Sequence, residues 1–247
     1  SRWLPQNRSS LTEKLWNQVE AALGNLPGRF PHRRDTLKCQ MGFGWDFAPP
    51  LRTIGIWDDA YLVVSEQVLI KDIHVEQDVT PSSAVVTANV QLDSTHDSQV
   101  ELRLILTGET FAMHPLTIKQ SIHLLKGPSL HRLALAIPDP KLWWPWDHGH
   151  PHLYRLSVEV WHKDQLLDSD SMLIGIRDLD LEDWTVRVNG HRIYSRGANW
   201  VPADILPGRV SGTDYKDLVT LARQANMNML RVWGGGLREK RAFYEAC

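Results

Sequence analysis

VVTANVQL at residues 85–92 and VELRLIL at residues 100–106 are the two stretches from which the fold class of this chain follows. Both are rich in β-branched and aliphatic residues, which favour strands. The polar run at 93–98 separates them as a turn. Further stretches of the same kind follow at 131–137 and 153–161. Short strands at this regular spacing predict an all-β sandwich.

The pattern changes after Arg177, where residues 186–194 predict a β-hairpin. Its centre is Asn189-Gly190, and this pair suits a type I′ turn because both central residues of that turn need positive φ. The sequence therefore predicts two short antiparallel strands joined by a two-residue turn.

A helix and a strand are predicted next. Ser211 and Asp214 form a capping box for a helix over residues 213–226, and residues 227–233 predict a buried strand. Strand, helix, strand, helix is the order of a (β/α) repeat, so we expect residues 178–247 to be the start of a (β/α)8 barrel.

Residues 1–66 contain one predicted helix. Ser10 and Glu13 form its capping box, an apolar face follows, and Gly24 ends it. Residues 60–64 (AYLVV) predict a strand.

A loop between these elements has a composition suited to sugars. Residues 38–50 read KCQMGFGWDFAPP, and GIW follows at 55–57. Glycines and prolines fix a turn that presents Trp45 beside Asp46. An aromatic plane suits the C–H face of a sugar, and a carboxylate accepts hydrogen bonds from its hydroxyls. The alternative is a buried Trp45 with Asp46 bound to backbone N–H groups.

Two further motifs stand at the predicted ends of barrel strands, where functional residues of such barrels gather. They read GANWVPAD at 197–204 and NMLRVWGGG at 228–236. We expect Asn199, Trp200, Arg231 and Trp233 to line a pocket there. The alternatives are core packing for Trp200, a strand-end salt bridge for Arg231 and a flexible loop for the glycines.

These motifs occur in collinear order and resemble family 2 glycoside hydrolases, especially their β-mannosidase branch. The resemblance rests on the loop around Trp45-Asp46, on the two strand-end motifs, and on the structural segment Trp143-Trp144-Pro145. The chain departs from the usual family pattern at Phe47, where a second Trp is usual, and at Ala48, where a Gly is usual.

The resemblance implies three domains. Residues 1–66 would end a jelly-roll sugar-binding domain, residues 67–177 would form an immunoglobulin-like β-sandwich, and residues 178–247 would start the catalytic barrel. It also implies a retaining exo-hydrolase that removes non-reducing terminal β-D-mannose from a β-linked oligosaccharide or glycoside.

The resemblance also implies roles for individual residues. Trp45, Asp46, Asn199, Trp200, Arg231 and Trp233 would bind substrate, with Arg231 beside the catalytic nucleophile. Both catalytic glutamates are expected beyond Cys247, because Glu239 and Glu245 fall on the second predicted helix. The 247-residue chain alone is therefore expected to be inactive and to be part of a longer protein.

Two alternatives stay open at this point. One is another family 2 activity, namely β-galactosidase, β-glucuronidase or exo-β-glucosaminidase. The other is a non-catalytic carbohydrate-binding module built on the sandwich, which would account for the eleven tryptophans without a catalytic residue.

Composition excludes several classes of function. A net charge of −2 without a basic stripe argues against nucleic-acid binding, and no apolar run is long enough to span a membrane. Cys39 and Cys247 lie too far apart in sequence to suggest a disulfide framework, which allows a reducing compartment such as the cytoplasm. The segment 147–152 (DHGHPH) reads as a loop, so we expect neither a metal nor a cofactor.

Overall fold

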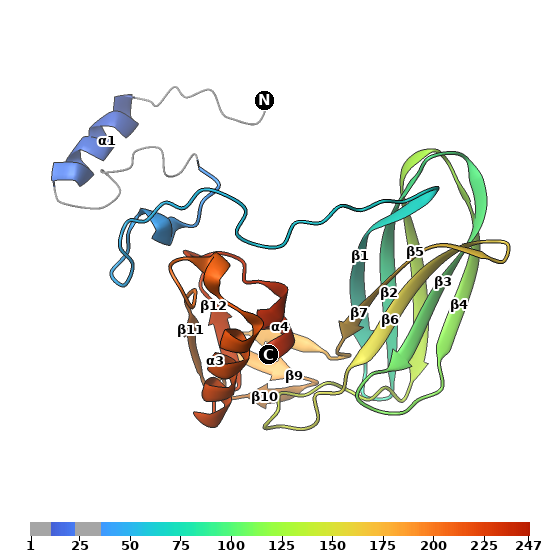
Figure 1. The fold of residues 1–247 in the computed structure, drawn as a ribbon. Coiled ribbons are helices and arrows are strands. Elements are labelled where there is room, and N and C mark those ends of the chain that lie inside the picture. Colours follow the sequence, from blue (N-terminus) through green and yellow to red (C-terminus); the bar gives the residue numbers. More distant parts are fainter. Residues whose placement is uncertain (1–10, 23–35) are drawn as a thin grey trace. The chain divides into compact units, whose positions relative to one another are not determined.

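The computed structural model describes residues 11–22 and 36–247, which form two compact units (Figure 1). One unit comprises residues 62–195. The other joins the described residues before Leu62 to residues 196–247, so its two parts lie far apart in the sequence. The three consecutive domains expected at 1–66, 67–177 and 178–247 stay a prediction.

The larger part of the first unit is a two-sheet antiparallel β-sandwich, as the strand spacing predicts. One sheet has the order β1-β2-β5 and the other the order β4-β3-β6-β7. The strands are β1 (Val68–Val79), β2 (Ser83–Ser94), β3 (Ser98–Gly108), β4 (Leu116–Leu124), β5 (Gly127–Pro138), β6 (Tyr154–His162) and β7 (Gln165–Ile174).

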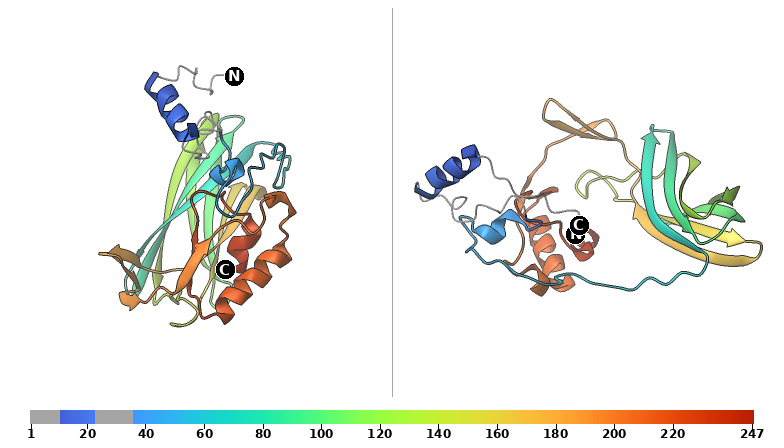
Figure 2. Two further views of the ribbon diagram at one scale, coloured as in Figure 1. Left: turned by 90° about the vertical axis from the view of Figure 1, so that its left-hand side faces the viewer. Right: turned by 90° about the horizontal axis from the view of Figure 1, so that it is seen from above.

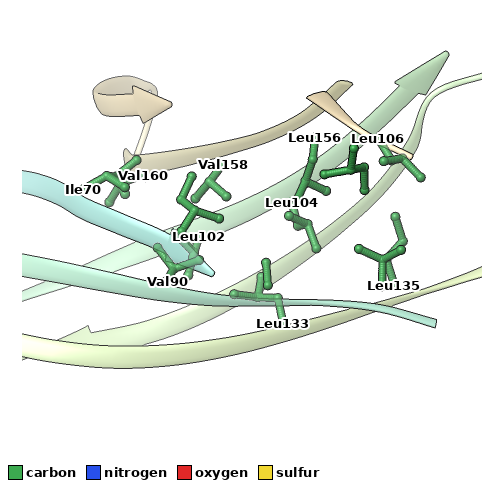
Figure 3. Close-up of a cluster of buried hydrophobic side chains, with 14 of the residues drawn as sticks. Ile70, Val90, Leu102, Leu104, Leu106, Leu133, Leu135, Leu156, Val158 and Val160 are labelled. Atoms are coloured by element: carbon green, nitrogen blue, oxygen red, sulfur yellow. The ribbon is translucent and has the colours of Figure 1, made fainter. Parts of the chain in front are cut away.

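The sandwich core follows from the period of two in its strands. Along β3, the side chains of Leu102, Leu104 and Leu106 are buried, while the residues between them are only partly covered. Leu104 pairs with Val158 of β6, and the buried side chains of the two sheets point toward one another (Figure 3). Alternate residues of a strand point to opposite faces, so these aliphatic residues meet in one apolar layer.

A segment between β5 and β6 connects the sandwich to a small sheet within the same unit. Trp143 N–H donates to Ile176 O, and Trp143 O accepts from Asn189 Nδ2. The guanidinium carbon of Arg177 lies 4.7 Å from the centre of a Trp143 ring. Trp143 is therefore held by its backbone N–H, its backbone carbonyl and its ring.

The small sheet has the order β10-β9-β8 and contains the predicted hairpin. Its strands are β8 (Leu179–Glu182), β9 (Thr185–Val188) and β10 (His191–Ile193). Asn189 and Gly190 have φ values of 51° and 77°, which confirms the expected turn with two positive-φ residues.

The second unit contains a parallel strand pair with a helix between its strands. β11 (Gly197–Trp200) pairs in parallel with β12 (Met229–Val232), and α3 (Gly212–Gln224) connects them (Figures 1 and 2). α3 begins with the predicted capping box, in which Ser211 Oγ and the Asp214 carboxylate each accept from the other's backbone N–H. Two shorter elements complete this segment, the 3₁₀ helix η3 (Pro207–Arg209) and α4 (Arg241–Ala246).

The order β11-α3-β12-α4 agrees with the start of a (β/α) repeat, and the eight-stranded barrel itself stays a prediction. The expectation of a buried second strand is wrong in detail, because β12 alternates between exposed and half-buried residues. Among the described residues, β11 is the only strand that pairs with β12. The cluster around Trp200 covers one face of this strand pair.

The N-terminal segment partly agrees with the sequence. α1 (Leu11–Ala22) is present, while its predicted cap Ser10 and stop Gly24 lie outside the described residues. The predicted strand at 60–64 is wrong: these residues are exposed and belong to no strand. A β-favouring sequence forms a strand only when a partner supplies hydrogen bonds. No described helix is long and apolar enough to span a membrane.

Candidate functional site

The loop that carries Trp45 and Asp46 is a compact turn. It begins with the 3₁₀ helix η2 (Gln40–Phe43), which buries Met41 and Phe43 and ends at Gly44 with φ 105°. Trp45 N–H then donates to Ala48 O over 2.8 Å, and Ala48 N–H donates back to Trp45 O over 3.3 Å. This closed turn leaves the side chains of Trp45, Asp46 and Phe47 exposed.

Three aromatic rings from this turn and from the end of β12 meet in one cluster. The Trp45 and Trp233 centroids are 5.1 Å apart with the planes at 62°, and the Phe47 and Trp233 centroids are 5.7 Å apart at 68°. Both are edge-to-face contacts, an arrangement that aromatic pairs prefer. We call Trp45, Phe47 and Trp233 the aromatic cluster. The structure thus brings together Trp45 and Trp233, which the sequence predicts as site residues.

A backbone hydrogen bond joins the same two segments. Met41 N–H donates to Gly235 O over 3.1 Å. Gly235 is glycine for a steric reason, because a Cβ at this position would lie 2.2 Å from Cζ2 of Trp233. The Trp233 ring therefore folds over the backbone of its own loop, and this position needs the missing side chain.

The polar residues of the two strands lie on one face of the pair. Asn199 and Arg231 are partners in register, and Arg231 Nη1 donates to Asn199 Oδ1 over 2.9 Å. Both residues are exposed. Trp233 follows directly after β12, two residues beyond Arg231. This contact is not the strand-end salt bridge that the sequence left open for Arg231.

Trp200 lies on the opposite face of the pair, at 9% exposure. It packs with Val210, Tyr215 and Phe243, and its ring centroid is 4.5 Å from that of Phe243. This placement agrees with the core-packing alternative that the sequence left open. The predicted contact of Trp200 with substrate stays untested.

Glu239 is not predicted as a site residue by its sequence motif, and it is buried at 5% exposure. It was expected on a helix, but it precedes α4 and faces the core. Its Oε1 accepts from Trp200 Nε1 over 3.0 Å, and its Oε2 accepts from the Tyr215 hydroxyl over 2.6 Å. Burial and the Glu239 carboxylate raise the pKa of Tyr215 above its usual value, because both disfavour the tyrosinate. No local sequence pattern distinguishes Glu239, since its partners are distant in the chain.

Other polar residues near these segments have structural contacts. Asp204 accepts from the Leu206 N–H over 2.8 Å, which is a turn contact. A groove of about 600 Å³ is lined by residues that include Lys38, Arg52, Trp57 and Pro207. Among the residues that the structure describes, no group of three His, Cys, Asp or Glu side chains is placed to hold a metal ion.

Part of the chain matches a known family of proteins. Residues 68–177, which form the β-sandwich, match the sequence model of Glycosyl hydrolases family 2. Over 228 residues the chain is 31% identical to Beta-mannosidase B of Neosartorya fischeri, covering 88% of this chain and 26% of that protein. The chain therefore resembles glycosyl hydrolase family 2, with the family match lying in its β-sandwich. It spans about a quarter of the length of the curated relatives it matches.

Two further comparisons agree. Beta-mannosidase B of Thermothelomyces thermophilus is 32% identical over 224 residues, with coverage of 85% of this chain and 25% of that protein. The crystal structure of the beta-D-mannosidase from Dictyoglomus thermophilum superposes with a TM-score of 0.79 at 30% identity. That superposition covers 85% of this chain and 27% of the solved one, so the likeness to the family extends well beyond the sandwich.

Proposed function

We propose that this chain is part of a retaining exo-β-mannosidase of family 2, which removes non-reducing terminal β-D-mannose. Two kinds of support favour mannose over the other sugars of the family. The curated relatives at about 30% identity are named Beta-mannosidase B, and the solved neighbour at 30% identity is a beta-D-mannosidase.

The observation that carries the proposal is the aromatic cluster with Asp46 beside it. Trp45 is 43% exposed and Trp233 is partly exposed, so aromatic surface is available to the apolar face of a sugar. Asp46 lies next to Trp45 at the exposed turn, where its carboxylate can accept hydrogen bonds from two adjacent hydroxyls. Together they form one wall of a sugar subsite.

Arg231 and Asn199 form a second part of the proposed subsite. The guanidinium is held by Asn199 Oδ1, and its remaining N–H groups are available to orient a carboxylate or a sugar hydroxyl. We propose that Trp200 supports this subsite by packing on the opposite, buried face of the strand pair, because its ring is buried.

The bond-breaking step needs two carboxyl groups about 5–5.5 Å apart, one as nucleophile and one as acid/base. Glu239 is buried and already bound by two donors, and Glu245 pairs with Arg241 on α4. We therefore propose that both catalytic glutamates lie outside these 247 residues, and that this chain contributes substrate-binding residues.

The test uses p-nitrophenyl β-mannoside, β-galactoside, β-glucuronide and β-glucosaminide. Each is incubated with the 247-residue chain and with the protein encoded by the whole reading frame that contains it. We expect turnover of the mannoside by the whole protein alone.

Each other outcome contradicts part of the proposal. Preference for another glycoside would replace β-mannosidase by that family 2 activity. Turnover by the 247-residue chain itself would place the catalytic carboxylates within it. Binding of sugars without turnover by either protein would support a carbohydrate-binding module.

A further inference from the structure

The loop between Trp233 and Glu239 is closed at both ends by a single residue, Trp200. At its start, Trp233 N–H donates to Trp200 O over 2.9 Å. At its end, Glu239 Oε1 accepts from Trp200 Nε1 over 3.0 Å. The backbone carbonyl and the side chain of one buried residue therefore hold the two ends of one loop, which we call the glycine loop (residues 233–239).

Both carboxylate oxygens of Glu239 accept hydrogen bonds in the core. A buried carboxylate is costly unless both oxygens are hydrogen-bonded, and here the second oxygen accepts from the Tyr215 hydroxyl over 2.6 Å. Tyr215 belongs to α3, so the carboxylate ties the glycine loop to the helix and to the end of β11. Loss of the carboxylate would leave two buried donors without a partner.

The glycine loop carries the parts that meet the Trp45 turn. Trp233 contacts both Trp45 and Phe47, and Gly235 O accepts from Met41 N–H. Any displacement of the loop therefore moves one of the three rings of the aromatic cluster and one end of this backbone bond.

We propose that Glu239 is a positioning residue for the sugar subsite, acting through Trp200 and the glycine loop on Trp233. The inference rests on the proposed function for its kinetic consequence only. Its structural consequence, a glycine loop held in place by the Glu239 carboxylate, is independent of which sugar is bound.

Four variants separate positioning from simple stability. Glu239→Ala removes both hydrogen bonds, while Glu239→Gln keeps an oxygen for the Trp200 N–H. Trp200→Phe keeps a ring in the core and removes the N–H donor. Tyr215→Phe removes the other donor and leaves the bond between Trp200 and Glu239 intact. Glu245→Ala is the matched control, because Glu245 is exposed and pairs with Arg241 on α4.

Hydrogen exchange measured by mass spectrometry on the 247-residue chain gives a readout that needs no activity. In Glu239→Ala we expect exchange to accelerate about tenfold in peptides covering 233–239 and 40–44, since one or two hydrogen bonds are lost. In the same variant, exchange in β2 and β3 should match that of the parent chain. In the control Glu245→Ala, exchange of the glycine loop should also match that of the parent chain. Unchanged exchange in the glycine loop, or equal acceleration everywhere, would overturn the inference.

Kinetics on the protein from the whole reading frame give the second readout. We expect Glu239→Ala and Trp200→Phe each to raise KM for the mannoside about five- to tenfold with a smaller effect on kcat, and Glu239→Gln to restore most of the loss. The double variant Glu239→Ala with Trp200→Phe should be no worse than Glu239→Ala alone, because Trp200→Phe removes a bond that Glu239→Ala already removes.

The outcomes distinguish the two proposals. An inactive parent whose glycine loop still loosens in Glu239→Ala contradicts the proposed function and supports the loop contact. An active parent whose KM is unchanged in Glu239→Ala and Trp200→Phe overturns the positioning role. Tyr215→Phe is expected to lower the melting temperature without a change in KM, and a KM increase equal to that of Glu239→Ala would indicate a purely structural effect.

Discussion

Asn199 and Arg231 stand opposite each other in register across β11 and β12, and Arg231 Nη1 donates a 2.9 Å hydrogen bond to Asn199 Oδ1. The bond fixes one edge of the guanidinium, and in the proposed subsite its other N–H groups would bind a ligand. It also links two segments separated by the whole of α3. The side chain that the resemblance places beside the nucleophile is thus oriented by a neighbouring strand.

The first prediction concerns this arginine. Arg231→Lys keeps the charge but loses the planar fork, so we expect kcat/KM of the whole protein to fall about ten- to a hundredfold. Hydrolysis of p-nitrophenyl β-mannoside measures this fall. Arg192→Lys in β10 is the matched control, because Arg192 is an exposed arginine of the small sheet. Equal kinetics for both variants would contradict a binding role for Arg231.

The second prediction concerns the aromatic cluster. Trp45→Ala removes one ring of the proposed sugar wall, and we expect KM to rise about two- to tenfold, since an aromatic contact contributes about 0.5–1.5 kcal/mol beyond its buried area. Trp161→Ala is the control, because Trp161 is also partly exposed but lies in β6 of the sandwich, beneath Arg103. A larger KM effect from Trp161 would exclude Trp45 as the sugar platform.

The third prediction separates the charge of Asp46 from the shape of its turn. Asp46→Asn is nearly isosteric, and the turn is held by backbone bonds between Trp45 and Ala48, so the loop should keep its form. Hydrogen bonds to a charged group contribute about 1.5–3 kcal/mol, which corresponds to a loss of about ten- to a hundredfold in kcat/KM. Titration calorimetry with mannose on the whole protein checks the same loss in binding. If Asp46→Asn leaves the affinity for mannose unchanged, Asp46 has a structural role and does not bind the sugar.

The fourth prediction follows from the raised pKa of Tyr215. A tyrosine whose folded-state pKa lies above its unfolded value adds stability that is complete below about pH 10. As pH rises above that point, the unfolded state ionises first and the stability of the unit declines. Tyr215→Phe should be less stable at pH 8 and lose less between pH 8 and pH 11. Urea unfolding at several pH values measures both, and identical pH slopes would contradict the buried contact with Glu239.

The fifth prediction tests the sandwich core. Leu104 is fully buried, so Leu104→Ala should lower the free energy of unfolding of this unit by about 2–5 kcal/mol. Leu130→Ala in β5 is the control, since Leu130 is 70% exposed, and it should change stability by less than about 0.5 kcal/mol. Calorimetry of the 247-residue chain measures both. Similar values would mean that the core lies elsewhere.

Much of the fold could be predicted because its signals are local. The alternation of residues 100–106, the Asn189-Gly190 pair and the capping box at Ser211 each depend on neighbours in sequence. The strand expected at 60–64 failed because a β-favouring composition does not specify a partner strand. Burial of β12 was overestimated for the same reason, since it depends on what covers its outer face.

Sequence motifs predict which residues belong to the candidate site, but they do not predict the contacts between those residues. Trp45 and Trp233 are both expected from their motifs, but no local pattern indicates that their rings touch or that Phe47 joins them. Glu239 could not be predicted, because a buried carboxylate can be recognised only once its hydrogen-bond donors are known. Those donors, Trp200 and Tyr215, come from β11 and α3, and only the folded chain brings them together.

The division of one compact unit between the two ends of the chain has a consequence for synthesis. The turn with Trp45 leaves the ribosome long before Trp233, and 188 residues (233 minus 45) must be added in between. At about 5–20 residues per second, this takes about 10 to 40 s. During that interval the nascent Trp45 turn has no Trp233 to pack against, while the sandwich strands are already complete. The Trp45 turn therefore lacks this packing partner until late in synthesis, and the proposed sugar subsite can form only after Trp233 has been added.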